Sequence, residues 1–384
     1  MQLRPVIRSI MNRQIPQAGY FPESLLDAAA AVSSFRGKFS RLTSVERILT
    51  TLRHKEPDRV PVTPLANAVG RRIKGIPFPE YSTVAEKTAD ALSASIEFVG
   101  GDLLVLLIDL SVEAADFGQE TIYPEQSTAH PNYLNPVIRH VDDYLNIKPI
   151  DFSKASRMNE IVKLCRLMNQ RIGSRIPVSG FLFGPLEILL MMRGAKDFYK
   201  DCRNYPGHVK KACEAITETL LEFAQAQCDT GVLGITIDTL LASWNALPKD
   251  VWTALEGDFT GEIARCVRRN GQVVGIHNCG HALYFDAQID AMAPDFISFA
   301  ELPDDCKTPA EMKERYGDRV TFVGFVRTQT LVNGTPQQVM DECKQQIEVL
   351  ARDGGYILAP GCEYPPNLSL ENAFALVKAA ELYS

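Results

Sequence analysis

The stretch Gly271-Gln-Val-Val-Gly-Ile-His-Asn-Cys-Gly280 is a short apolar run that ends in His277 and Cys279. Residues two positions apart in a strand point to the same face, so this imidazole and this thiol can bind one ion. Two further apolar runs end in similar groups, Cys362 at the end of residues 355–362 and Glu301 at the end of residues 296–301. If the three strand ends are neighbours, a histidine, two thiolates and a carboxylate surround Zn²⁺.

Eight apolar runs of this kind follow one another along the chain. They are continuous rather than alternating, which is typical of strands buried on both faces of a parallel sheet. The predicted strands are residues 59–65, 102–109, 176–184, 232–238, the run that ends at Cys279, 296–301, 320–326 and 355–362. Apolar residues at three- and four-residue spacing predict helices over residues 83–98, 197–228, 250–269 and 336–352.

Strands that alternate with helices predict an α/β fold, namely a (β/α)₈ TIM barrel formed by residues 44–384. The alternative is an open doubly wound sheet, but no Gly-x-Gly-x-x-Gly turn follows the first strand. Residues 1–43 do not fit the repeat and are predicted to be a helical extension that packs on the barrel or on a partner subunit, which makes a homodimer plausible. Residues 110–154 form a long connection of the kind that often covers a barrel's site.

The composition is ordinary for a globular protein: of the 384 residues, 46% are hydrophobic and 23% are charged. The formal net charge of −7 argues against a nucleic-acid partner, which requires clustered Lys and Arg. The short basic pairs Arg71-Arg72 and Arg268-Arg269 are interpreted as solvated helix faces.

Cysteine usage and hydropathy predict a cytoplasmic protein. The nine cysteines are odd in number and lack the spacing of a disulfide scaffold, and the N-terminus lacks the long apolar core of a secretory signal. No apolar run reaches the roughly 18 residues that a membrane span needs. Cysteines other than Cys279 and Cys362 are assigned to packing.

Ionisable groups gather at the ends of the predicted strands, where barrel enzymes place their active sites. The residues at such ends are Asp109, Asp238, His277, Cys279, Glu301 and Cys362. Asp109 and Asp238 are candidates for substrate positioning or proton handling, and a purely structural role for either stays open. His281 is expected to support the ligands rather than to bind the ion.

The ligand set constrains the chemistry. Zn²⁺ has no redox chemistry and acts as a Lewis acid. Two thiolates and a carboxylate leave a formal charge of about −1, which makes hydroxide formation from bound water unfavourable. Such a site suits a substrate thiolate that stays nucleophilic, or a substrate heteroatom that is polarised as a methyl group leaves. Glu301 is expected to be the exchangeable ligand.

The chain resembles the uroporphyrinogen decarboxylase superfamily over residues 43–384, and within it the zinc-containing, corrinoid-dependent methyltransferases. The stretches that carry the resemblance are Glu56-Pro-Asp-Arg-Val-Pro-Val62, Gly101-Asp-Leu-Leu104, Asp109-Leu-Ser-Val-Glu-Ala114, Gly184-Pro-Leu-Glu187, Gly275-Ile-His-Asn-Cys279 and Pro360-Gly-Cys-Glu-Tyr-Pro-Pro-Asn367. His-x-Cys followed much later by Cys separates the methyltransferase branch from the decarboxylases. The resemblance, shared with cobalamin-independent methionine synthase, implies that His277, Cys279, Glu301 and Cys362 bind Zn²⁺.

The resemblance also implies a reaction. A methyl group would move between a small substrate, either a methoxylated aromatic or a thiol such as coenzyme M, and cobalamin. The chain has no Asp-x-His-x-x-Gly motif for cobalamin, so a separate corrinoid protein would carry it. Aromatic residues at the barrel mouth are candidates for substrate binding, although core packing explains them equally well: Phe181, Phe183, Trp244 and Tyr364. The direction of transfer stays open.

Two alternatives use the same fold. The first is a metal-free decarboxylase of a porphyrinogen-like acid, but the arginine motif of the decarboxylases is not reproduced in residues 62–72, and a decarboxylase has no use for zinc ligands. The second is a barrel with a structural zinc. Structural sites usually have four Cys or His ligands, so a mixed site at the mouth argues against it.

Overall fold

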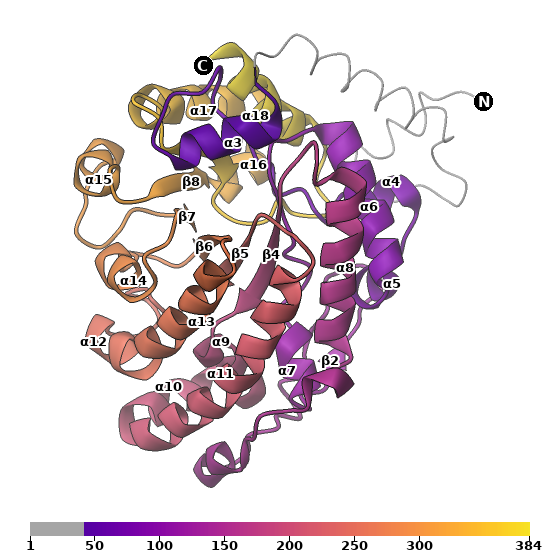
Figure 1. Ribbon diagram of the computed structural model, residues 1–384, viewed down its shortest axis with the longest axis vertical. Helices are drawn as coiled ribbons and strands as arrows, with labels where there is room; N and C mark the ends of the chain where they lie inside the picture. Colours follow the sequence, from indigo (N-terminus) through magenta and orange to yellow (C-terminus); the bar gives the residue numbers. More distant parts are fainter. Residues whose placement is uncertain (1–41) are drawn as a thin grey trace.

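The computed structural model describes residues 42–384, so all but the last two residues of the extension predicted for residues 1–43 lie outside the described part. Within that part, one sheet of seven parallel strands has the order β1-β4-β5-β6-β7-β8-β9 (Figure 1). The strands are β1 (Leu104–Val105), β4 (Val178–Phe183), β5 (Gly234–Asp238), β6 (Val273–Asn278), β7 (Phe296–Phe299), β8 (Thr321–Val326) and β9 (Tyr356–Pro360). Each lies within a run that the sequence predicts to be a strand, and the α/β barrel is confirmed.

The first predicted strand is reduced to a single parallel bridge between Val62 and Leu358 of β9. Its backbone still joins both neighbours. The Leu358 N–H donates to the Pro61 carbonyl at 2.8 Å, and the Asp102 N–H donates to the Val62 carbonyl at 2.7 Å. Pro61 and Pro64 have no N–H, so a longer ladder cannot form. The segment occupies the eighth position, between β9 and β1, and closes the ring.

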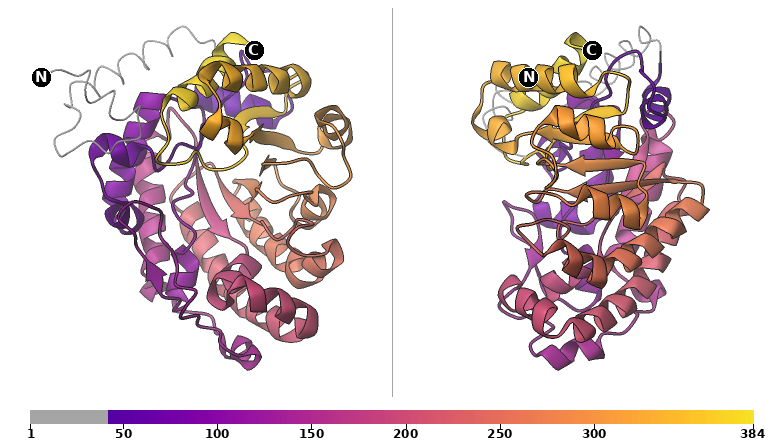
Figure 2. Two further views of the ribbon diagram at one scale, coloured as in Figure 1. Left: turned by 180° about the vertical axis from the view of Figure 1, so that it is seen from behind. Right: turned by 90° about the vertical axis from the view of Figure 1, so that its left-hand side faces the viewer.

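Helices surround the strands on the outside (Figure 2). The helices that connect successive strand positions are α6 (Ala85–Val99), α8 (Arg157–Ile172), α11 (Pro206–Cys228), α13 (Asp258–Arg269), α14 (Phe285–Met292), α15 (Pro309–Tyr316) and α17 (Pro336–Leu350), and α18 (Glu371–Leu382) follows the last strand. Shorter helices accompany them: α3 (Ser44–Leu52), α4 (Gly70–Lys74), α5 (Phe78–Thr83), α7 (Val112–Asp116), α9 (Pro185–Arg193), α10 (Ala195–Asn204), α12 (Lys249–Trp252) and α16 (Thr328–Asn333). No helix within residues 42–384 combines the length and the apolar character that a bilayer crossing requires.

Two predicted helices are interrupted. The helix expected over residues 197–228 is two helices, α10 and α11, because Pro206 cannot continue a helix from its preceding turn but fits the first turn of the next one. The helix expected over residues 250–269 starts as α12, passes through the π-helical turn η3 (Thr253–Gly257) and continues as α13. Such π turns occur frequently near functional sites.

The long connection after β1 is partly ordered into short elements. After α7 it forms a two-stranded antiparallel hairpin of β2 (Thr121–Ile122) and β3 (His130–Pro131). The 3₁₀ turns η1 (Val141–Asn146) and η2 (Phe152–Lys154) follow, and both lie against α11.

Strand register decides which side chains meet at the barrel mouth. Asp238, His277 and Ser298 are direct partners at the carboxyl-end side of β5, β6 and β7, and Phe183 of β4 pairs with Asp238. Paired residues of parallel strands point to the same side of the sheet. These four side chains therefore form one layer of the barrel interior.

Candidate metal centre

Three ligand-type side chains converge at the carboxyl ends of β6 and β9. His277 is the second-last residue of β6, and Cys279 follows that strand directly. Cys362 lies two residues after the end of β9. One ligand atom from each residue lies within 4.8 Å of the others, a grouping that can hold a metal ion. The structure thus brings together three of the four residues that the sequence proposed as ligands.

The imidazole of His277 is oriented for coordination. Its Nδ1 lies 3.0 Å from Oγ of Ser298, whereas its buried Nε2 has no hydrogen-bond partner in the described part of the chain. A histidine ligand commonly donates its other N–H to an oxygen atom, which fixes the tautomer. Ser298 plays that part here and leaves the Nε2 lone pair for an ion. The sequence pattern did not single out Ser298, because a lone serine within an apolar run carries no signal.

The two thiols are unequal. The hydrogen bond from Cys279 lowers the pKa of Cys362 to about 4, with help from His277 and against the effect of burial. The same interaction with Cys362, together with burial, raises the pKa of Cys279 above its ordinary value. Burial alone would lower the pKa of His277, but the nearby Cys362 and the charge of Asp238 raise it. The contact between the two sulfur atoms thus favours a thiolate in this group before any ion binds, and thiolate is the form that binds metals.

Asp238 lies beside the ligands. It pairs in register with His277, is 6% exposed, and its Oδ1 accepts a hydrogen bond from the Leu240 N–H at 3.0 Å. Burial, with a smaller contribution from the charge of Cys362 and against the opposite effect of His277, raises its pKa to about 6. Its carboxyl group can therefore change protonation state in the neutral range.

Glu301 is not part of the group. The strand β7 ends at Phe299, and the Glu301 side chain is 53% exposed, with its Oε2 in contact with Nδ1 of His281. Glu301 as the fourth ligand therefore stays a prediction, since its carboxylate contacts His281 and lies outside the group formed by His277, Cys279 and Cys362.

Asp109 is engaged structurally. Its Oδ2 accepts from the Arg157 guanidinium at 2.7 Å, and its Oδ1 accepts from the N–H and hydroxyl of Ser111. These bonds connect the segment after β1 to α8, which favours the structural role for Asp109 that the sequence left open.

The four aromatic candidates separate into three kinds. Phe181 and Phe183 are buried with ring centroids 5.3 Å apart, and the Phe181 ring lies 6.5 Å from the His277 ring. Trp244 is 71% exposed on the loop after β5. Tyr364 is fully buried and its hydroxyl donates to the Ser369 carbonyl, so a direct substrate role for Tyr364 is not supported.

Two arginines predicted to lie on a helix surface are buried instead. Arg71 is 1% exposed and Arg72 is fully buried. Arg71 stacks over the Phe78 ring and donates to Asn367, while Arg72 donates to the carbonyls of Pro366 and Leu368. Both arginines therefore stabilise the loop that follows Cys362. No local sequence pattern predicts these contacts between the arginines and that loop.

The sequence analysis did not identify two further carboxyl groups, those of the buried Glu113 and the half-buried Glu363. Burial raises the pKa of Glu113, whose Oε1 accepts from the Phe183 N–H at 3.0 Å, to about 8. Burial, with the charge of the adjacent Cys362, also raises the pKa of Glu363 to about 8.

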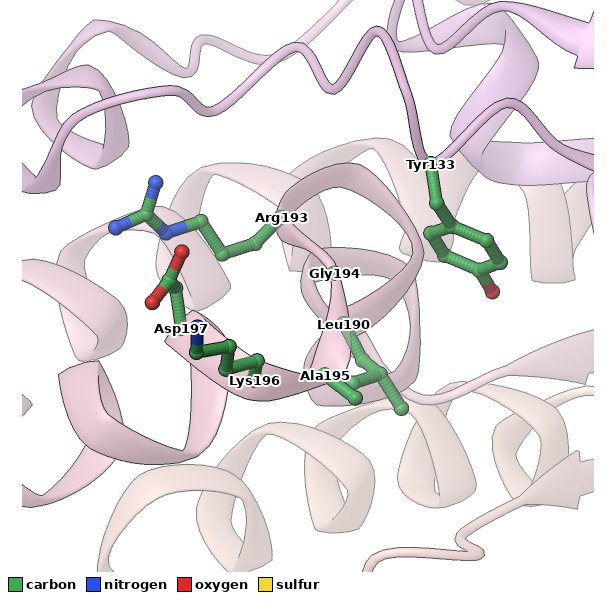
Figure 3. Close-up of a pocket in the computed structure, with 7 residues that line it drawn as sticks. All are labelled: Tyr133, Leu190, Arg193, Gly194, Ala195, Lys196 and Asp197. Carbon is green, nitrogen blue, oxygen red and sulfur yellow. The ribbon is translucent and has the colours of Figure 1, made fainter.

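A hollow of about 480 Å³ lies elsewhere, at the junction of α9 and α10 (Figure 3). It is lined by Tyr133, Leu190, Arg193, Gly194, Ala195, Lys196 and Asp197. The Arg193 side chain is already paired with Asp201 at 2.7 Å, and none of the three ligand residues borders the hollow.

Residues 43–383 match the family described as uroporphyrinogen decarboxylase (URO-D). The chain belongs to the URO-D family. This member is 24% identical over 348 residues to the methylcobamide:CoM methyltransferase MtaA of Methanosarcina barkeri. The alignment covers 90% of this chain and 99% of the relative. The chain is 22% identical over 352 residues to the methylcobamide:CoM methyltransferase MtbA of Methanosarcina acetivorans, at 89% and 98% coverage.

A solved structure shares the URO-D barrel described above. It is a methyltransferase from Methanosarcina mazei, with a TM-score of 0.73 and 23% identity, covering 90% of this chain and all of that chain. The resemblance predicted from the sequence, to this family and to its methyltransferases, is confirmed.

Proposed function

We propose that this URO-D family member is a zinc-dependent methyltransferase that moves a methyl group between a small substrate and the cobalamin of a separate corrinoid protein. The observation that carries the proposal is the convergence of His277, Cys279 and Cys362 at the barrel mouth. The MtaA and MtbA relatives, named as methylcobamide:CoM methyltransferases, support the class of reaction.

The donor set fits zinc. Two sulfur atoms and one imidazole nitrogen are ligands that Zn²⁺ prefers, and three protein ligands with one open position are the arrangement of catalytic zinc sites. The buried, unpartnered Nε2 of His277 supports the fit, because an orphaned polar atom in a protein interior calls for a partner. Bound there, zinc would act as a Lewis acid on a substrate sulfur or oxygen atom.

The chain's own residues have separable roles in this proposal. Ser298 holds the tautomer of His277, and Phe181 and Phe183 exclude water from the barrel interior below the ligands. Asp238, with its pKa raised to about 6 by burial, accepts the proton that a substrate thiol releases when it becomes a thiolate.

We infer that the partner approaches from the open rim, where Trp244 stands 71% exposed. The substrate is either a thiol that receives the methyl group or a methoxylated aromatic that donates it. The same three ligands serve both directions, so a spectroscopic experiment must separate them.

The test mixes the zinc-loaded protein with methylcobalamin and a panel of thiols, and separately with cob(I)alamin and a panel of methoxyarenes. Interconversion of the cobalt spectra in one arm identifies the direction and the substrate class. Cys362→Ser is expected to lose at least 100-fold in rate, as a lost zinc thiolate should cost. Cys266→Ser is the matched control, since Cys266 is buried in α13 outside the ligand group.

The alternative from the family name is a metal-free decarboxylase. Full activity of Cys362→Ser, or an active protein without metal, would favour that alternative and overturn the proposal. One tightly bound zinc per chain with cobalt turnover would exclude it.

A further inference from the structure

We propose that Glu187 and Glu256 share a single proton across a buried carboxyl–carboxylate contact, and that this pair positions the turn after β5 beside the ligand group. Neither residue belongs to the candidate centre. Glu187 lies in the first turn of α9 and is 1% exposed, and Glu256 lies in the π-helical turn η3 and is fully buried.

The geometry requires a proton between the two groups. A methyl group built on Gly184 would meet Oε1 of Glu256 at 2.5 Å and Oε2 of Glu187 at 2.6 Å, so both oxygens converge over that glycine. As carboxylates both groups only accept hydrogen bonds, which leaves Oε2 of Glu187 without a donor among the described residues. Two buried carboxylates so close together cannot both be ionised, so one carries a proton.

The remaining oxygens show which group carries it. Oε1 of Glu256 accepts from the Leu186 N–H at 2.8 Å and its Oε2 accepts from Trp252 Nε1 at 2.6 Å, so both of its oxygens already face donors. Glu187 uses only Oε1, which accepts from the Leu241 N–H at 3.0 Å. The proton therefore resides on Oε2 of Glu187, which donates to Glu256.

The surroundings agree with this assignment. Burial, followed by the charges of Glu256 and Asp238, raises the pKa of Glu187 well above its ordinary value, and burial raises the pKa of Glu256 to about 7. The other titratable groups that face the pair are Asp238, Tyr199, Cys202 and Cys213. None of these is a cation, so no positive charge replaces the shared proton.

The pair links segments that frame the mouth. It receives N–H groups from the start of α9, from the turn after β5 and from α12. That turn begins at Asp238, whose carbonyl accepts from the Gly184 N–H at 2.9 Å, and leads to the exposed Trp244. Loss of the pair would release the turn from the barrel end at which His277 sits.

The chain provides its own probe, because Trp244 and Trp252 are its two tryptophans. In full-length, metal-loaded Trp244→Phe protein, emission comes from Trp252, whose indole N–H donates to Glu256. We expect its emission to titrate near pH 7. Adding Glu187→Gln replaces one neutral donor to Glu256 with another and should leave the midpoint within about half a pH unit, whereas loss of an ionised Glu187 would lower it by a unit or more. Adding Glu256→Gln should abolish the transition.

A second measurement separates a shared proton from simple packing. At pH 8 the urea midpoint of Glu187→Gln should be at least as high as that of the parent. At pH 5 the two midpoints should be the same. Glu256→Gln should lower the midpoint at both pH values, because its amide faces either the Leu186 N–H or the Trp252 N–H. A Trp252 transition that is absent in the parent, or that falls by a pH unit or more in Glu187→Gln, would overturn the proposal.

Discussion

Ser298 and His277 face each other across β6 and β7, with the serine Oγ 3.0 Å from Nδ1 of the imidazole. The hydroxyl can accept a hydrogen bond from the Nδ1–H group, which leaves Nε2 without a proton and able to share an ion with the sulfur atoms of Cys279 and Cys362. Both strands place the two residues in register, so the orientation of the ligand is built into the sheet.

Removal of that hydroxyl should weaken metal binding without unfolding the barrel. Ser298→Ala is expected to lower zinc affinity about 10- to 100-fold, the usual cost of losing a group that orients a ligand. Competition with a chromophoric chelator measures the affinity. Ser179→Ala is the control, because that buried serine of β4 contacts Thr236 and no ligand. Equal affinities in the two variants would contradict the assigned role of Ser298.

Arg72 should be essential for stability rather than for catalysis directly. Arg72→Met removes the donors to the carbonyls of Pro366 and Leu368, and each buried acceptor left unpaired costs about 1–3 kcal/mol. Equilibrium unfolding in urea is therefore expected to show a loss of roughly 2–5 kcal/mol. Arg352→Met, on a side chain that is 85% exposed, should change stability by less than about 0.5 kcal/mol. A similar small effect in Arg72→Met would show that the loop does not depend on it.

Glu113 should make folding stability fall as the pH rises. Its pKa is 4.5 ordinarily and about 8 in the fold, where burial disfavours the charge, so the folded chain binds this proton more tightly. The stabilising contribution is complete below the ordinary pKa and is lost as the pH rises through about 8.

Glu113→Gln should remove this dependence, since an amide oxygen still accepts from the Phe183 N–H. The variant is expected to be more stable than the parent at pH 9 by an amount on the order of a few kcal/mol, and equal to it at pH 5. Urea midpoints across this range measure the effect. The exposed Glu314→Gln serves as the control, and parallel pH profiles for all three proteins would refute the assignment.

Trp244 and Tyr364 should respond differently to substitution. Trp244→Ala, on the exposed rim, is expected to raise the KM for the substrate or the corrinoid protein about 10-fold with little change in stability, as loss of an aromatic contact typically does. Tyr364→Phe should lower stability by about 1 kcal/mol, because its hydroxyl donates to the Ser369 carbonyl, and leave KM unchanged. A KM change confined to Tyr364→Phe would reverse the two roles.

The barrel was predictable because strands buried on both faces form continuous apolar runs. The same argument predicted that His277, Cys279 and Cys362 meet, since each ends such a run and barrel strands end at one face. The first strand was overestimated, because Pro61 and Pro64 restrict its pairing to a single bridge.

Other features depend on contacts that local sequence patterns do not encode. The turn of Glu301 toward His281 arises from the bend after β7. The burial of Arg71 and Arg72 depends on a loop nearly three hundred residues later in the chain. The meeting of Glu187 and Glu256 depends on a π-helical turn, and a helical spacing rule does not anticipate such a turn.

X-ray absorption at the zinc edge of the purified full-length protein is the most direct test of the metal site. One zinc per chain is expected, with two sulfur atoms at about 2.3 Å and at least one nitrogen at about 2.0–2.1 Å. In Cys362→Ser, one sulfur should be lost from this shell. A protein that turns over without metal, or a zinc shell made of oxygen and nitrogen alone, would contradict a centre built from His277, Cys279 and Cys362.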